Sequence, residues 1–455
     1  MSSETTGTRP VPDDVVRRLD RVAAERQAES RVPGLLVGLV RGRELVWSNA
    51  VGVADVDAGV PPTADTQFAV GSITKTFTAA LVMALRDEGR LDLDDRLGEH
   101  LPDTRHQHVT LRRMLAHASG LQREPLGDIW DTFQMPDADA LLEDFEAAEQ
   151  VLPPSTRWHY SNLAYAVLGQ VVARIDGRTW ADSLRARVLV PLGLERTTLL
   201  PEGEVATGYF TDPFSDAVHV QPVSDLSALA PAGALWSTLT DLTTWAGFLA
   251  AGDDRLLPDA RIEEMAQVQV MADPLRWGLA WGLGLELFRS GERIYAGHTG
   301  GMPGFLSAVV AHRDSGTAAI VLANAMSGFD PGDTAVSLLD LLLDEDAAPV
   351  PAWRAGAAVP ADLADLVGRW WVEGSPTELS VHGGALQARM EEAPRHAPPA
   401  VFERLDADTF RTVSGRERGE LLRVTRDAAG AVTVLHWATY RMSRQPESFG
   451  EQRGG

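Results

Sequence analysis

The residues Gly71-Ser72-Ile73-Thr74-Lys75 open a predicted helix, Thr74 to Asp87, whose apolar residues recur at helical spacing. Residues three apart share a helix face, so the hydroxyl of Ser72 and the amine of Lys75 can approach each other. The unpaired N–H groups at a helix N-terminus favour an anion that develops at the nucleophile or on its acyl oxygen. A buried, neutral lysine can accept the serine proton, so this short stretch predicts a nucleophile paired with a base.

Lys75 is also conspicuous in the composition of the chain. It is the only lysine among 41 basic residues, and the other 40 are arginine. A codon bias towards arginine accounts for the 40 arginines, and the alternative to a functional role is that one lysine escaped this bias by chance. Only lysine offers an amine whose pKa can fall far enough to act as a base, which favours a functional reason for its retention.

A second polar group, Tyr160-Ser161-Asn162, stands just before a predicted helix, Leu163 to Ile175. A phenol held near an ammonium group has its phenolate form favoured, so Tyr160 is expected to share base duty with Lys75 and later to protonate the leaving group. On its own, a tyrosine beside a turn asparagine is more often a core residue.

The third group, His298-Thr299-Gly300-Gly301, follows a predicted strand, Arg293 to Ala296. Small residues there would let a substrate backbone lie against the strand. An N–H near Gly301 could join that of Ser72 in an oxyanion hole. The alternative is a glycine-rich turn without a functional role.

In this order, the three groups resemble the serine β-lactamase and penicillin-binding protein superfamily, in particular its branch of class C β-lactamases, D-aminopeptidases and family VIII esterases. The resemblance covers roughly residues 10 to 345, and the segments Leu115 to Leu121 and Val321 to Asn324 fit it as well. It implies that Ser72 is acylated, that Lys75 is its base partner and that Tyr160 is the second proton-transfer group. It implies oxyanion-hole amides at Ser72 and Gly301, and a substrate-binding set of Asn162, His298, Thr299, Gly300, Gly301 and Asn324.

One position departs from the pattern of many β-lactamases, which have Lys-Thr-Gly where this chain has His298-Thr299-Gly300. A permanent cation that would hold a carboxylate is replaced by an imidazole, whose ordinary pKa of about 6.5 leaves it mostly neutral at pH 7. The resemblance implies that this exchange is common among esterases and peptidases of the branch. We therefore expect inefficient penicillin hydrolysis.

The pattern of predicted elements indicates an α+β fold in two domains. Predicted strands at Leu35 to Val40 and Glu44 to Val53, joined across Arg41-Gly42, and others at Leu306 to His312 and Thr317 to Asn324 enclose a helical middle. We expect residues 1–345 to form a β-lactamase-like domain, an antiparallel sheet flanked by helices with a helical subdomain. A linker at 346–360 and short strands at 361–455 predict a small all-β C-terminal domain, for which a lipocalin-like barrel is one arrangement.

Composition narrows the partners. The 455 residues carry 41 Lys plus Arg against 64 Asp plus Glu, a net charge of −23, which repels nucleic acids and anionic membrane surfaces. There is no cysteine, and no long apolar run indicates a signal peptide or a membrane span. We expect a cytoplasmic protein that needs no metal or cofactor and takes a small-molecule or short peptide substrate; nothing in the sequence indicates its oligomeric state.

The leading hypothesis is a serine hydrolase that acts through an acyl-enzyme on esters or amides, of the esterase or D-amino-acid peptidase type. A first alternative is an acyl transferase resembling penicillin-binding-protein-type peptide cyclases, which pass the acyl group to an amine. A second is a binding or sensor protein that is acylated and does not turn over.

Overall fold

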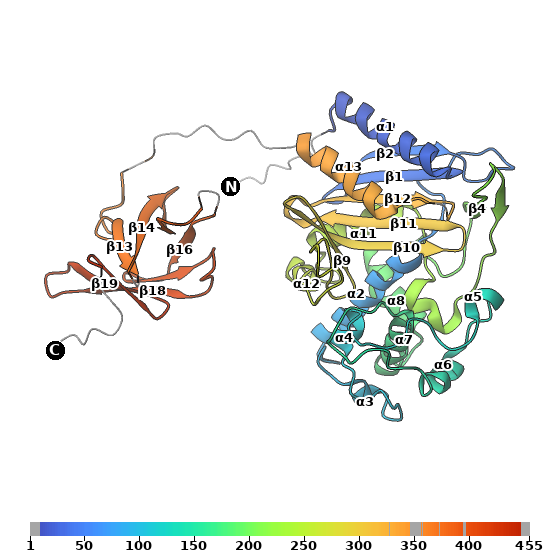
Figure 1. The fold of residues 1–455 in the computed structure, drawn as a ribbon, viewed down its shortest axis with the longest axis horizontal. Helices are drawn as coiled ribbons and strands as arrows, with labels where there is room; N and C mark the ends of the chain where they lie inside the picture. The colour runs from blue at the N-terminus through green and yellow to red at the C-terminus, as the bar shows by residue number, and fades with distance from the viewer. Residues whose placement is uncertain are drawn as a thin grey trace. The chain divides into compact units, whose positions relative to one another are not determined.

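The computed structural model describes residues 10–326, 328–345, 356, 358–372, 374–394 and 397–446. The chain divides into two compact units, residues 1–348 and 349–455 (Figure 1). Most of the predicted linker at 346–360 lies outside the described residues. Within the described part, no helix combines the length and the apolar character needed to cross a membrane.

The first unit is built on an eight-stranded sheet in the order β2-β1-β12-β11-β10-β9-β8-β7. Every neighbouring pair is antiparallel. The strands are β1 (Gly34–Arg41), β2 (Glu44–Gly52), β7 (Val270–Met271), β8 (Leu279–Trp281), β9 (Glu286–Ser290), β10 (Arg293–Met302), β11 (Phe305–His312) and β12 (Thr317–Ala323). The pairing of β1 with β12 confirms that strands from both ends of this unit meet in one sheet.

Helices cover both faces of the sheet (Figure 1). On one face lie α1 (Asp13–Ser30) and α13 (Pro331–Glu345), which contact β1, β2, β11 and β12. On the other lie α2 (Thr74–Asp87) and α11 (Leu239–Ala251). Because both faces are covered, β12 is buried at every position and reads in the sequence as a continuous apolar run instead of an alternating one.

Strand β10 is longer than the sequence predicts. It does not end at Ala296 but continues to Met302, paired with β11 throughout, so the His298 to Gly301 group lies within a strand and is not a turn. Glycines make this possible, because a Cβ at Gly300 would lie 2.0 Å from the carbonyl oxygen of Val70. Glycine is uncommon inside strands, so the sequence predicts that the strand ends before the glycines. The close packing of neighbouring backbone is what requires glycines within β10.

The helical region lies between the two halves of the sheet in the sequence. Its central helix is α7 (Asn162–Asp176), which is buried along most of its length. The other elements are η1 (Gly71–Ile73), α3 (Leu97–His100), α4 (Leu111–Leu115), α5 (Ile129–Thr132), α6 (Ala138–Phe145), α8 (Trp180–Leu184), α9 (Val190–Leu192), α10 (Ala230–Gly233) and α12 (Asp259–Met265), with short strand pairs β3 (Phe68–Ala69) with β6 (Trp236–Ser237) and β4 (Tyr209–Thr211) with β5 (Val218–Val220).

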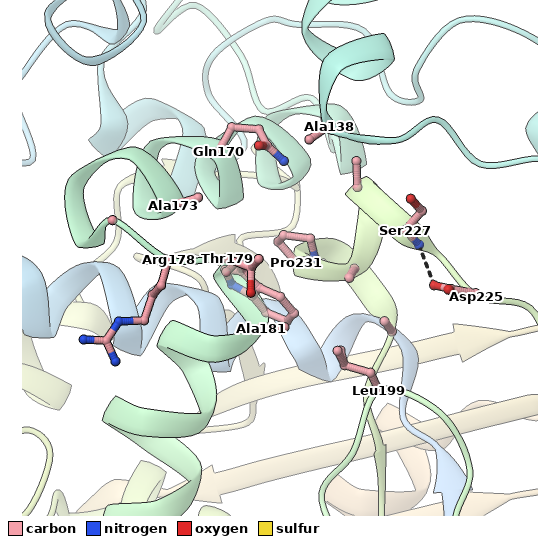
Figure 2. Close-up of a pocket in the computed structure, with 15 residues that line it drawn as sticks. Ala138, Gln170, Ala173, Arg178, Thr179, Ala181, Leu199, Asp225, Ser227 and Pro231 are labelled. Carbon is pink, nitrogen blue, oxygen red and sulfur yellow. Dashed lines mark hydrogen bonds between the residues drawn. The ribbon is translucent and has the colours of Figure 1, made fainter.

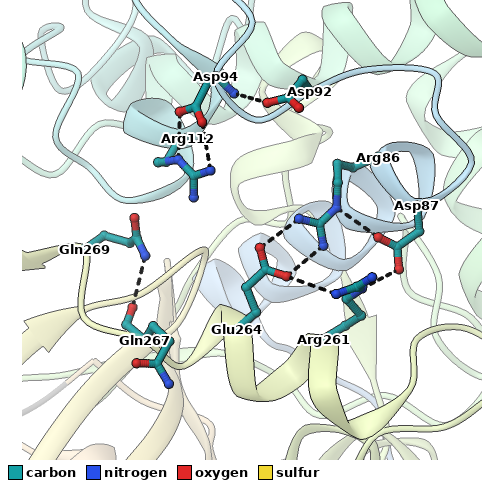
Figure 3. A network of polar contacts seen from close by, with 9 residues as sticks. All are labelled: Arg86, Asp87, Asp92, Asp94, Arg112, Arg261, Glu264, Gln267 and Gln269. Atoms are coloured by element: carbon teal, nitrogen blue, oxygen red, sulfur yellow. Dashed lines mark hydrogen bonds and ion pairs between the residues drawn. The ribbon is translucent and has the colours of Figure 1, made fainter. Parts of the chain in front are cut away.

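An ion-pair network ties the end of α2 to α12 (Figure 3). The guanidinium of Arg86 donates to both carboxylate oxygens of Glu264, at 2.7 and 2.9 Å, and Arg261 donates to Asp87 at 2.8 Å. The two-pronged geometry fixes the relative position of the helices, although a pair this close to solvent contributes only about 1 kcal/mol.

The second unit is a closed barrel of eight strands in sequence order. Its core holds Trp370, Phe402, Phe410 and Leu435. The short strands that the sequence predicts here are present, and the last two strands of the barrel turn at Ala438, which has a φ of 53°. The strands are β13 (Gly368–Val372), β14 (Ser375–His382), β15 (Ala385–Met390), β16 (Ala400–Arg404), β17 (Thr409–Thr412), β18 (Leu421–Arg426), β19 (Val432–Trp437) and β20 (Tyr440–Ser443).

Candidate active site

A cleft of about 850 Å³ lies where the N-terminal end of α2 meets strand β10. Its lining includes Ser72, Tyr160, Asn162 and all of residues 298–301. Lys75 lies beneath this surface and is fully buried. The structure thus brings together three groups that are separated by more than 80 residues in the sequence.

Ser72 belongs to η1, a single 3-10 turn that runs directly into α2. The turn holds its hydroxyl against Lys75, with 2.9 Å between Oγ and Nζ. Gly71, which precedes it, has a φ of 51°, a value that side-chain-bearing residues rarely adopt. A Cβ at Gly71 would also lie 2.7 Å from the backbone nitrogen of Gly301, so glycine permits the close approach of η1 and β10.

Lys75 has two hydrogen-bond partners besides Ser72. Its Nζ lies 2.8 Å from Oδ1 of Asn162 and 2.6 Å from the carbonyl oxygen of Ala232, and both of these atoms accept hydrogen bonds only. Burial lowers the pKa of Lys75 to about 7. In its neutral form, which dominates above pH 7, the amine has two hydrogens for these two acceptors, and its lone pair is left to accept the proton of Ser72. This is the geometry of a general base acting on a nucleophile.

Each partner of Lys75 is itself held in place. The Nδ2 group of Asn162 donates to Glu124 at 2.6 Å, which turns the amide so that its oxygen faces the lysine. Ala232 belongs to α10, where the adjacent carbonyl of Pro231 accepts from Thr78 of α2 at 2.7 Å. The other side of α10 borders a second cavity of about 530 Å³, into which the ring of Pro231 projects (Figure 2).

Tyr160 is positioned by His117. The two rings stack with their centroids 4.2 Å apart, and Nδ1 of His117 accepts from the backbone N–H of Ser161 at 3.0 Å. Ser161 in turn caps α7 by accepting from Ala164 at 3.0 Å. His117 therefore acts as a hydrogen-bonding structural residue, and it orients the tyrosine over the cleft.

The expected phenolate at Tyr160 is wrong for the resting site. Burial raises the pKa of Tyr160 well above its ordinary value and outweighs the contact with Ser72 that lowers it. Lys75 cannot supply the compensating charge, since its own pKa falls to about 7 and much of it is neutral. Tyr160 thus stays protonated, with its ring 4.8 Å from the lysine Nζ, and is placed to donate a proton.

His298 lies on β10, buried in the wall of the cleft. Its Nδ1 contacts the carbonyl oxygen of Thr299, an atom that only accepts hydrogen bonds, so Nδ1 carries the ring proton. Burial lowers the pKa of His298 to about 3, which makes the ring neutral at all working pH values. Where many β-lactamases carry a lysine, this chain therefore has no positive charge at all, whereas an exposed histidine would keep a partial one.

Glu286 is a site residue that the sequence analysis misses. It is the first residue of β9, and its carboxylate accepts from the backbone N–H of Thr299 at 2.9 Å and lies 3.0 and 3.1 Å from the Thr299 hydroxyl. Burial raises its pKa to about 7. Glu124, beside Asn162, is missed as well, and burial raises its pKa too.

Asn324 is not brought together with the other expected residues. It is fully buried just beyond β12 and is not among the residues that line the cleft. Its side chain accepts from Gly34 at 2.6 Å and donates to Val53 and Ala54 at 3.1 Å each. All of the polar atoms of its side chain are engaged with backbone, so Asn324 joins β12 to the first hairpin.

Comparisons with known proteins agree with this arrangement. A family model described as "Beta-lactamase" matches residues 19–343, and one described as "Domain of unknown function (DUF7586)" matches residues 359–444. Penicillin-binding protein 4 of Amycolatopsis lactamdurans is 32% identical over 337 residues, 69% of this chain and 86% of that protein. The D-aminopeptidase of Brucella anthropi is 25% identical over 383 residues, 80% of this chain and 68% of that protein. The structure of D-amino acid amidase from Ochrobactrum anthropi SV3 with D-phenylalanine is 26% identical, with a TM-score of 0.62, and covers 73% of this chain and 98% of its own.

Proposed function

The chain belongs to the β-lactamase family, and from this premise we propose that it is a serine hydrolase that forms an acyl-enzyme on Ser72 and cleaves amides or esters of small or D-configured amino acids. The single observation that carries the proposal is the hydrogen bonding of Lys75. Its two acceptor partners, at 2.8 and 2.6 Å, leave the lone pair of the neutral amine for Ser72, at 2.9 Å.

The residues at the site account for each proton in an acylation step. Lys75 takes the proton of Ser72 as Oγ attacks the substrate carbonyl, and the N–H groups of Ser72 and Gly301 stabilise the oxyanion. As the carbon–heteroatom bond breaks, Tyr160 gives its proton to the leaving group and is reprotonated from Lys75. Water then cleaves the acyl-enzyme by the reverse route, which returns the proton to Ser72.

The walls of the cleft favour a substrate with an apolar group. Trp158 and Trp281 line it with their ring centroids 5.0 Å apart, and Trp130 lies at its margin with 37% of its surface exposed. Aromatic walls bury apolar surface with little loss of side-chain freedom. The D-aminopeptidase and D-amino acid amidase among the relatives support the choice of D-configured substrates.

The test measures acylation and turnover separately. Purified protein is exposed to p-nitrophenyl acetate and to D- and L-phenylalanine amide, with intact mass followed alongside nitrophenol or ammonia release. We expect turnover, with a preference for the D-amide, and an acyl adduct that maps to Ser72. Ser72→Ala abolishes both, whereas Ser315→Ala, the same change in the surface turn before β12, abolishes neither.

The products separate this proposal from its alternatives. Free acid as the product supports hydrolysis. A cyclic or amine-linked product would favour acyl transfer, and a stoichiometric adduct that persists without turnover would favour a sensor. Full turnover by Ser72→Ala would refute the role of Ser72.

A further inference from the structure

The side chain of His298, in the wall of the cleft, has no hydrogen free to donate to a ligand. Nδ1 of His298 faces the carbonyl oxygen of Thr299 and lies 4.0 Å from Oε1 of Glu286, so both neighbours of Nδ1 are acceptors and it bears the proton. In a neutral ring the other nitrogen, Nε2, then carries only a lone pair. Nε2 is buried and has no hydrogen-bond partner within the described part of the chain.

Glu286 likewise fixes the direction in which the Thr299 hydroxyl donates its hydrogen. At pH 8 the carboxylate form of Glu286 dominates, because burial raises its pKa only to about 7. A carboxylate can only accept, so the hydroxyl, 3.0 and 3.1 Å from its two oxygens, donates its hydrogen to Glu286. What Thr299 then offers a ligand is a lone pair.

The charged residues around His298 and Thr299 also disfavour an anionic ligand. Glu124 lines the same cleft, and Asp330 contributes further negative charge near Glu286. Arg123 is a cation at the mouth of the cleft, but its side chain is 62% exposed and its Nε lies 3.5 Å from Oε1 of Glu124, so its charge is offset. Lys75 is turned towards Ser72 and Asn162.

We propose that Glu286 is a specificity-determining residue that makes the Thr299 hydroxyl an acceptor towards the cleft, so that the site binds substrates with an N–H donor beside Thr299 and rejects those with a carboxylate there. This inference rests on the proposed function and names the substrate class it serves. A buried carboxylate facing a second carboxylate is repelled, and each acceptor without a donor partner remains desolvated.

Two matched pairs of thioesters test the inference. The first pair, N-acetyl-D-alanyl thioglycolate and N-acetyl-D-alanyl thioglycolamide, differs by carboxylate against carboxamide on the leaving side. The second, the methyl thioesters of succinic acid and succinamic acid, differs in the same way on the acyl side. Released thiol is read with a disulfide reagent at pH 8, without background from the protein because the chain has no cysteine.

Binding and turnover are measured in separate arms. In the Ser72→Ala protein, titration calorimetry gives the affinity for each intact thioester, and in the wild type the thiol assay gives kcat/KM. We expect the carboxamide to be favoured about tenfold or more in at least one pair, as buried like-charge contacts imply. Since the binding arm needs no turnover, it decides the inference even where the wild type fails to hydrolyse, a failure that would count against the proposed function alone.

The variant Glu286→Gln identifies the cause of the preference. Glutamine keeps an oxygen for the Thr299 N–H and presents an amide donor to the hydroxyl, which frees the hydroxyl to donate to a ligand. We expect the preference to narrow to about threefold or less, since one repulsive charge is gone. Glu264→Gln, the same change in the network of Figure 3, keeps the wild-type ratio.

Two results would overturn the inference. One is a carboxylate bound as tightly as its carboxamide in both pairs. The other is a preference that Glu286→Gln leaves at its wild-type value, which would assign the discrimination to other groups in the cleft.

Discussion

The titration of Lys75 makes the stability of this protein depend on pH in a way that one substitution, Lys75→Met, removes. Burial lowers the pKa of Lys75 from 10.5 to about 7. A shift of about 3.5 units at 1.36 kcal/mol per unit means that keeping the proton in the folded state costs about 5 kcal/mol. The folded pKa is below the unfolded one, so between pH 7 and 10.5 the unfolded chain binds more protons.

The sign and the size of the effect follow from this difference. Stability rises with pH wherever the unfolded state binds more protons, so the wild type gains stability above pH 7 relative to Lys75→Met. Between pH 7 and pH 9 the gain is about 2 kcal/mol, because the folded state is half protonated at the start and almost unprotonated at the end. The other titrating groups are shared by both proteins, and their contributions largely cancel in the comparison.

The assay is urea unfolding of both proteins at pH 7, 8 and 9, followed by tryptophan fluorescence. Ser72→Ala is the control, since it keeps Lys75 and is expected to follow the wild type. The quantity compared is the difference in free energy of unfolding between the wild type and Lys75→Met. If this difference stays constant to about 0.5 kcal/mol from pH 7 to 9, Lys75 keeps a pKa near its ordinary value. In that case the lysine would be a cation at pH 7 and the base mechanism would be refuted.

Three further outcomes are expected. The kcat/KM of ester hydrolysis rises with pH about a midpoint near 7, where Lys75 loses its proton, and a profile that is flat from pH 5 to 9 would contradict this. Gly71→Ala lowers kcat about tenfold or more, as crowding beside a reacting centre does, because the new Cβ would lie 2.7 Å from the Gly301 nitrogen. Gly59→Ala is the control for backbone strain alone, since Gly59 has a φ of 66° and open space around it. Asn324→Ala lowers the free energy of unfolding by about 2 to 4 kcal/mol, because buried backbone groups lose their partners, while KM stays at its wild-type value; a raised KM with unchanged stability would return Asn324 to the binding site.

Much of the fold can be read from the sequence because its signals are local. The hairpin of β1 and β2, the helix α2 and most of the barrel strands follow from apolar periodicity and turn residues. The extent of β10 cannot be read in this way. Its glycines predict a break, and only the packing of η1 and β11 against it makes them a requirement of the strand.

The site shows the same division. Ser72 and Lys75 are three residues apart on one helix, so their contact is predictable from spacing alone. Glu286 is not predictable, because it alternates with Leu285 and Leu287 as a solvated residue of a half-exposed strand would. It is buried because both faces of this part of the sheet are covered, which only the assembled fold reveals.

The pKa of Tyr160 depends on a balance that sequence cannot supply. A nearby ammonium group would lower it, yet the same burial that brings the groups together also discharges the lysine and disfavours the phenolate. Burial in one shared environment therefore moves Lys75 and Tyr160 towards their neutral forms. The sequence alone, which shows only that the two residues are partners, predicts an ammonium and a phenolate.

The burial of the one lysine of the chain at the candidate active site has a practical consequence. Protein produced with ¹⁵N-labelled lysine carries one labelled side chain in 455 residues, and that label lies at Nζ of Lys75. Its resonance reports the protonation of the base, the arrival of a substrate and the formation of the acyl-enzyme, without assignment of any other signal. The atom proposed to take the proton of Ser72 is thereby also its own spectroscopic reporter.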